Sequence, residues 1–109
     1  MVYTIEEIKE KVEPIAKKYQ VPKIYIFGSY ARGQAKDTSD IDFIVNTNNL
    51  SYEQILNIFS SMYDDLEMVF HQEVDIIDEN DLYLPKRRES AKRFVRNVLN
   101  ERELVYELQ

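Results

Sequence analysis

The apolar positions of this chain follow two different periods, which divide it into helices and short strands. Over residues 4–19 they recur three and four positions apart, the spacing of a helix with one buried face. Thr4 and Glu7 form the capping box that begins such a helix. Pro14 has no backbone N–H to donate within the helix, so we expect a kink or a restart at that residue.

Beyond residue 20 the chain alternates between apolar strands and amphipathic helices. We expect strands at residues 23–27, 40–46 and 73–78, helices at 51–69 and 89–100, an irregular segment at 79–85, and a closing strand or helical end at 104–108. In the last helix, Phe94 and Val98 are expected to face the core. This order predicts an α/β fold in which helices pack on a sheet of three to four strands.

The composition narrows the kinds of chemistry that are open to the chain. A length of 109 residues fits one domain, over residues 1–109. There is no long apolar run and no signal peptide at the start, so we expect no membrane contact and a cytoplasmic protein. No cysteine and a single histidine exclude thiolate zinc sites and most histidine-based metal sites. The net charge of −6 argues against strong direct binding to nucleic acid. Catalysis would therefore rely on carboxylates, hydroxyls and backbone amides.

The only two glycines, Gly28 and Gly33, lie in one loop. Glycine is needed where the backbone turns sharply or approaches another group closely. Gly28 and Ser29 directly follow the strand at 23–27 and begin a short helical turn, whose first N–H groups can bind an anion. No Gly-Lys-Ser/Thr follows, so this is not a Walker P-loop. We interpret the loop as a phosphate-binding loop, with an ordinary turn as the alternative.

Two carboxylates alternate at the start of the strand at 40–46. Since alternate residues of a strand share a face, Asp40 and Asp42 point the same way while Ile41 points into the core. Two carboxylates this close repel each other, so the pKa of one of them should rise unless a cation lies between them. Oxygen ligands suit Mg²⁺ or Mn²⁺. The alternative is a solvent-facing edge strand that carries alternating acids.

Asp75 is a charged residue at the start of the otherwise apolar strand at 73–78. It lies on the opposite face from Val74 and Ile76, and it could serve as a third metal ligand and as a general base for an attacking hydroxyl. A surface carboxylate at a strand end is the alternative.

The phosphate-binding loop and the three carboxylates can meet in only one arrangement of the strands. The phosphate donors follow the carboxyl end of the strand at 23–27, and the first carboxylates lie at the amino end of the strand at 40–46. These two strands must therefore be antiparallel, and the strand at 73–78 must be parallel to the second for Asp75 to join the group. The chemistry thus predicts a mixed sheet.

The pattern Gly28-Ser29, ten residues, Asp40-Ile41-Asp42 resembles the signature of the DNA polymerase beta-type nucleotidyltransferase superfamily. The stretch GSYARGQAKDTSDIDFIV, residues 28–45, is similar to the minimal nucleotidyltransferases of bacteria and archaea. The resemblance spans essentially the whole chain; it is strongest over residues 26–45 and weakest after residue 80.

The resemblance implies a two-metal transfer of a nucleoside monophosphate, with pyrophosphate as the leaving group. By this resemblance, Gly28 and Ser29 would hold the triphosphate. Asp40 and Asp42 would bind both Mg²⁺ ions, and Asp75 would bind the second ion and help to deprotonate the acceptor hydroxyl.

Two assignments within the site stay open at this stage. Strand parity places Asp75 and Asp78 on opposite faces, so only one can be the third carboxylate, and the family pattern favours Asp75. Arg32 either contacts a phosphate or pairs with Asp37 or Asp40.

Minimal nucleotidyltransferases resemble antitoxins that inactivate a HEPN-domain ribonuclease toxin by transferring AMP from ATP to a tyrosine of the toxin. The resemblance therefore implies ATP as the substrate and a hetero-oligomer with a HEPN-type partner. One alternative is a non-catalytic antitoxin that masks its partner. Another is a small-molecule nucleotidyltransferase, although such enzymes usually carry a further helical domain, for which 109 residues leave no room.

Six of the 14 basic residues lie within residues 86–96, around the start of the last helix. A solvated flank that balances acidic neighbours is the simpler interpretation of such a charge run. Contact with a triphosphate or with an RNA-bound partner is the alternative.

Overall fold

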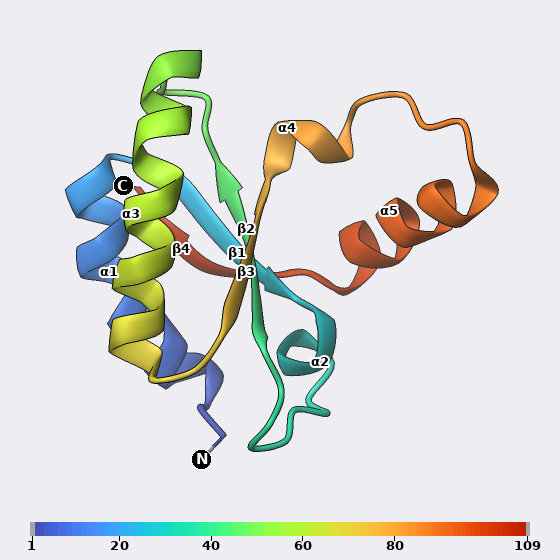
Figure 1. The fold of residues 1–109 in the computed structure, drawn as a ribbon. Helices are drawn as coiled ribbons and strands as arrows, with labels where there is room; N and C mark the ends of the chain where they lie inside the picture. Colours follow the sequence, from blue (N-terminus) through green and yellow to red (C-terminus); the bar gives the residue numbers. More distant parts are fainter. Residues whose placement is uncertain (1, 109) are drawn as a thin grey trace.

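The computed structural model describes residues 2–108, which form five helices and four strands (Figure 1). In chain order they are α1 (Ile5–Tyr19), β1 (Lys23–Phe27), α2 (Gly28–Ala31), β2 (Ile41–Asn46), α3 (Tyr52–Phe70), β3 (Val74–Asp78), α4 (Glu79–Leu82), α5 (Glu89–Glu101) and β4 (Glu103–Glu107). The predicted capping box at the start of α1 is present, and Ser51 and Gln54 form another at the start of α3. Helix α1 continues through Pro14 without restarting.

The strands form one mixed sheet in the order β3-β2-β1-β4. Strand β1 is antiparallel to both β2 and β4, and β2 is parallel to β3. The strand directions predicted from the chemistry of the site are therefore confirmed. The segment at residues 104–108, for which both a strand and a helical end were considered, lies mostly in the edge strand β4.

The two faces of the sheet are covered by different helices, with α1 and α3 on one side and α4 and α5 on the other (Figure 1). The larger core, under α1 and α3, is built from side chains that include Ile8, Val12, Ile24, Ile26, Phe43, Met62, Leu66 and Phe70. The smaller core on the other face contains Phe27, Ile44, Leu82 and Val98. Within residues 2–108, no helix is both long enough and apolar enough to cross a membrane.

The segment after β3 is more regular than predicted. Residues 79–85 were expected to be irregular, but Glu79–Leu82 form the short helix α4. The Asp78 carboxylate caps this helix by accepting a hydrogen bond from the Asn80 N–H at 3.0 Å. An aspartate followed by an acidic first turn is a helix start signal, and the sequence contains it.

Helix α5 packs on the sheet less completely than its apolar pattern predicts. Val98 is buried as expected, whereas Phe94 is 47% exposed and touches the sheet only edge-on, with its ring centroid 6.2 Å from that of Phe27. The smaller core is therefore open toward the start of α5.

Candidate active site

The sheet register places two of the predicted site residues, Asp42 and Asp75, together beside the end of β1. Asp42 lies opposite Phe27, the last residue of β1, and also opposite Asp75 of β3. Asp42 shares a face with Ile44, and Asp75 shares a face with Ile77, since alternate residues of a strand point the same way. Ile44 and Ile77 both belong to the smaller core. The carboxylates therefore lie on the face of the sheet that α4 and α5 cover only in part.

Asp42 is the most strongly perturbed carboxyl of this group. Burial, and then the neighbouring Asp75 and Asp40 carboxylates, raise the pKa of Asp42 to about 6. A hydrogen bond to Asp75 also favours the protonated form of Asp42, and Arg32 opposes the shift. Asp40 is exposed and precedes β2. A divalent cation would relieve the repulsion within this group, so the set of oxygen ligands fits Mg²⁺ or Mn²⁺.

The raised pKa of Asp42 predicts a specific dependence of stability on pH. Between the ordinary pKa of 3.8 and about 6, the folded protein holds a proton on Asp42 that the unfolded chain has released. The favourable contribution of Asp42 is thus complete below pH 3.8 and is lost as the pH rises to about 6. We expect this loss to be about 1–2 kcal/mol, after allowing for solvent screening.

Metal-free denaturant titrations between pH 4 and 7, on the natural chain and on Asp42→Asn, would measure this contribution. Other carboxyls titrate in both proteins, so the difference between the two free energies of unfolding isolates Asp42. The variant should be about as stable as the natural chain near pH 4 and more stable near pH 7. A difference that does not change over this range would contradict the prediction.

Only some of the predicted carboxylates gather closely. Among residues 2–108, no three histidine, cysteine, aspartate or glutamate side chains are close enough to hold a metal ion without rearrangement. Asp42 and Asp75 are in hydrogen-bond contact, and the charge of Asp40 acts on Asp42. Asp78 is engaged elsewhere, because it caps α4 and accepts a hydrogen bond from the Thr47 hydroxyl at 2.9 Å. Of the two candidates for the third carboxylate, the structure brings only Asp75 to Asp42.

Gly28 joins the predicted phosphate loop to the carboxylates. Its φ of +73° lies in the left-handed region, which favours glycine. A Cβ atom at this position would collide with Oδ2 of Asp42. The loop backbone therefore lies directly against the carboxylate, in a cradle that a side chain would fill. Ser29, the next residue, is half-buried.

A residue that the sequence analysis did not single out, Glu101, reaches this loop from the end of α5. Its Oε1 atom accepts a hydrogen bond from the Gly28 N–H at 3.1 Å. Arg32 pairs with the same carboxylate, with Nη1 3.2 Å from Oε1 and 3.1 Å from Oε2, and its Nε donates to Gln34. Of the partners considered for Arg32, neither Asp37 nor Asp40 is the one observed here. An acidic residue in the last turn of a helix was the available signal, since the helix dipole disfavours it there.

Two cavities of the protein lie away from these residues. One of about 500 Å³ is lined by α1 and β4, and one of about 330 Å³ lies near the end of α1. Asp42 and Asp75 lie on the other face of the sheet, and Asp40 and Asp75 are exposed. They therefore belong to an open surface that a second molecule could cover.

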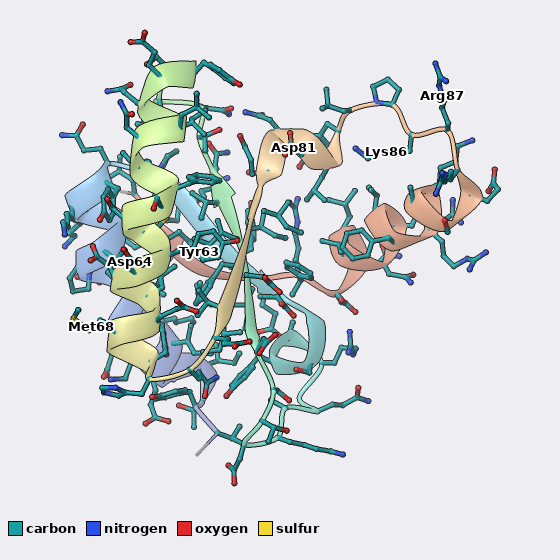
Figure 2. The ribbon with its side chains drawn as sticks, in the orientation of Figure 1. Tyr63, Asp64, Met68, Asp81, Lys86 and Arg87 are labelled. Carbon is teal, nitrogen blue, oxygen red and sulfur yellow. The ribbon has the colours of Figure 1, made fainter. Side chains whose placement is uncertain are left out.

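The basic segment at residues 86–96 makes mainly local contacts. The Lys86 ammonium donates to the backbone carbonyl of Asp81, near the end of α4, at 2.6 Å. Lys92 pairs with Glu89 on α5 at 3.4 Å. Figure 2 shows Arg87 pointing outward from the loop between α4 and α5. These contacts fit the simpler interpretation of a solvated flank.

Comparisons with known proteins agree with this geometry. The sequence matches the family described as "Polymerase beta, Nucleotidyltransferase" over residues 10–109. A relative from Methanocaldococcus jannaschii, named for an inferred protein adenylyltransferase activity, is 40% identical over 79 residues, which cover 72% of this chain and 82% of that protein. The protein adenylyltransferase MntA of Thermococcus cleftensis is 31% identical over 85 residues, which cover 72% of this chain and 81% of that protein.

Two solved structures share the fold. One, described as an inferred minimal nucleotidyltransferase, superposes with a TM-score of 0.62 at 25% identity, over 93% of this chain and 95% of that chain. A chain of a toxin–antitoxin complex crystallised with AMP-PNP superposes with a TM-score of 0.65 at 20% identity, over 93% of this chain and 74% of that chain.

The match to the family extends over almost the entire sequence and includes the loop, the carboxylates and the four-stranded mixed sheet. Relatives that align over most of their own length are named as protein adenylyltransferases. This chain therefore belongs to the polymerase beta nucleotidyltransferase family and is an enzyme of that family.

Proposed function

We propose that this chain transfers AMP from Mg-ATP to a hydroxyl group of a partner protein. The observation that carries the proposal is the placement of Asp42, in contact with Asp75 on one side and with the backbone of Gly28 on the other. Metal-binding carboxylates and a phosphate-binding loop must adjoin in any two-metal nucleotidyl transfer, because both act on the same phosphates.

Each candidate residue then has a defined role. Asp40, Asp42 and Asp75 would hold two Mg²⁺ ions, or Mn²⁺ in their place, and Gly28 and Ser29 would receive the triphosphate. Bound there, the metals would supply charge stabilisation for an in-line displacement at the phosphate.

Two further side chains complete this assignment. Asp75 is exposed and lies at the edge of the group, so it can also accept the proton of the acceptor hydroxyl. Arg32, next to the loop, provides a cation for the phosphates once it leaves Glu101.

The acceptor that fits best is a tyrosine of a HEPN-type ribonuclease toxin, bound to this chain as a hetero-oligomer. The exposure of Asp40 and Asp75 supports a macromolecular acceptor, because a second protein can reach both carboxylates. The name of the Thermococcus cleftensis relative supports a protein acceptor, and one solved complex of the same fold pairs a nucleotidyltransferase antitoxin with a HEPN toxin. Adenylylation of the toxin would place the protein in the cytoplasm, where both would meet ATP.

The test is to incubate the chain with α-labelled ATP, Mg²⁺ and the product of the neighbouring gene, the candidate HEPN partner. Label should appear on a partner tyrosine, and omission of Mg²⁺ or replacement of that tyrosine by phenylalanine should abolish it. Tight binding to the partner without transfer would favour a non-catalytic antitoxin. Label on a small hydroxylated molecule alone would favour a small-molecule transferase. Either result would overturn the proposal.

A further inference from the structure

Glu101 lies against the loop to which the proposed function assigns the triphosphate. One carboxylate of this residue accepts hydrogen bonds from the Gly28 N–H and from the Arg32 guanidinium. These are the two kinds of donor, a loop amide and an arginine, that bind phosphate oxygens in proteins. The carboxylate is also largely shielded, since the Glu101 side chain is 21% exposed.

We propose that Glu101 is an internal substitute for a phosphate, which the triphosphate must displace, and that it thereby sets the affinity of the protein for nucleotide. This inference rests on the proposed function, because it needs Gly28 to be part of the triphosphate site. It goes further by assigning a role to a residue outside the loop and the carboxylate group.

The Glu101 carboxylate and a phosphate cannot both bind the Gly28 N–H. Gly28 has a single N–H, which Glu101 already uses. A phosphate oxygen on the same donor would stand beside the Glu101 carboxylate, and two like charges at that distance repel each other. Bound phosphate therefore requires Glu101 to leave, and Arg32 can then transfer its ion pair from the carboxylate to the phosphate.

The position of Glu101 on its own helix supports this role. It is the last residue of α5, where the helix dipole disfavours a negative charge. Its placement there is therefore explained by the contacts with Gly28 and Arg32 rather than by helix stability.

Release of Glu101 needs only a rotation of its side chain, because the backbone around it is anchored. Arg102, the next residue, donates to Glu79 at 3.0 Å, and its guanidinium stacks 4.3 Å from the centroid of the Tyr25 ring. Glu79 is itself buried and also accepts hydrogen bonds from Asn46 and Tyr83. The junction between α5 and β4 can thus remain in place while the carboxylate turns away.

The test compares binding of a non-hydrolysable ATP analogue with Mg²⁺ by the natural chain, Glu101→Gln and Glu103→Gln, measured by calorimetry. Glutamine keeps the size of the side chain and an oxygen for the Gly28 N–H but removes the charge. We expect Glu101→Gln to bind the analogue about tenfold more tightly, because the competing internal contact is weakened. Glu103 is exposed on β4, so its variant is a matched control for the change in net charge and should bind like the natural chain.

The natural chain offers a second measurement that needs no variant. On addition of the analogue, the ¹³C signal of the Glu101 carboxyl should shift as its ion pair with Arg32 breaks, while that of Glu103 should stay in place. AMP lacks the β- and γ-phosphates and should leave the Glu101 signal unchanged.

Equal or weaker binding by Glu101→Gln, or a Glu101 signal that does not move on saturation, would overturn the inference and leave the proposed function standing. Failure of all three proteins to bind the analogue would overturn both.

Discussion

If the proposed function is right, replacement of Asp40 and Asp42 together by asparagine should abolish AMP transfer while the protein still folds and still binds the proposed partner. Asparagine has nearly the same size but carries no charge, so the proposed ligands lose their attraction for the divalent ions. Metal ions supply several kcal/mol of transition-state stabilisation in such reactions, so the rate should fall by at least about a thousandfold. Transfer of label from ATP to the partner, at saturating ATP and Mg²⁺, measures the effect.

The matched control is Asp64→Asn. Asp64 is exposed on α3, which covers the opposite face of the sheet, and Figure 2 shows it on the outer side of that helix. Its variant should retain full activity. Circular dichroism of the double variant should match that of the natural chain, which would separate a loss of chemistry from a loss of fold. Transfer within tenfold of the natural rate in a folded double variant would show that the wrong carboxylates have been chosen.

The relation between these carboxylates and Gly28 could be predicted from the sequence because it depends on strand direction alone. Once a phosphate loop at the end of one strand and carboxylates at the start of the next are required to meet, the strands must be antiparallel. Asp75 follows from the same argument, since β3 must be parallel to β2 for it to reach Asp42. The alternation of side chains then fixes the face on which they lie.

Glu101 could not be predicted in the same way. It lies 73 residues from Gly28 in the sequence, and their contact depends on how α5 packs across the sheet. Apolar periodicity gives the buried side of α5 but neither its angle nor its distance from the sheet, which is also why the exposure of Phe94 was not foreseen. The pairing of Arg32 was missed for the same reason, because its partner comes from that helix.

The largest structural effect is expected from Gly28→Ala. The left-handed backbone at this position, with φ +73°, disfavours any residue with a Cβ atom by about 1 kcal/mol or more. The added methyl group would also collide with the Asp42 carboxylate, and forcing a side chain into an occupied space costs about 1–3 kcal/mol. We therefore expect the variant to lose about 2–4 kcal/mol of the free energy of unfolding and, because Asp42 is pushed aside, to lose binding of Mg-ATP as well.

Gly33→Ala separates the effect of the left-handed backbone from the effect of the collision with Asp42. Gly33 has nearly the same φ, +72°, but nothing lies within 4 Å of an added Cβ atom. Its variant should lose only the conformational part, about 1 kcal/mol, and should bind nucleotide like the natural chain. Denaturant titration and calorimetry on the two variants would measure both quantities. Equal losses of stability with unchanged nucleotide binding would mean that the backbone of Gly28 does not lie against Asp42, and that the loop and the carboxylates do not form one site.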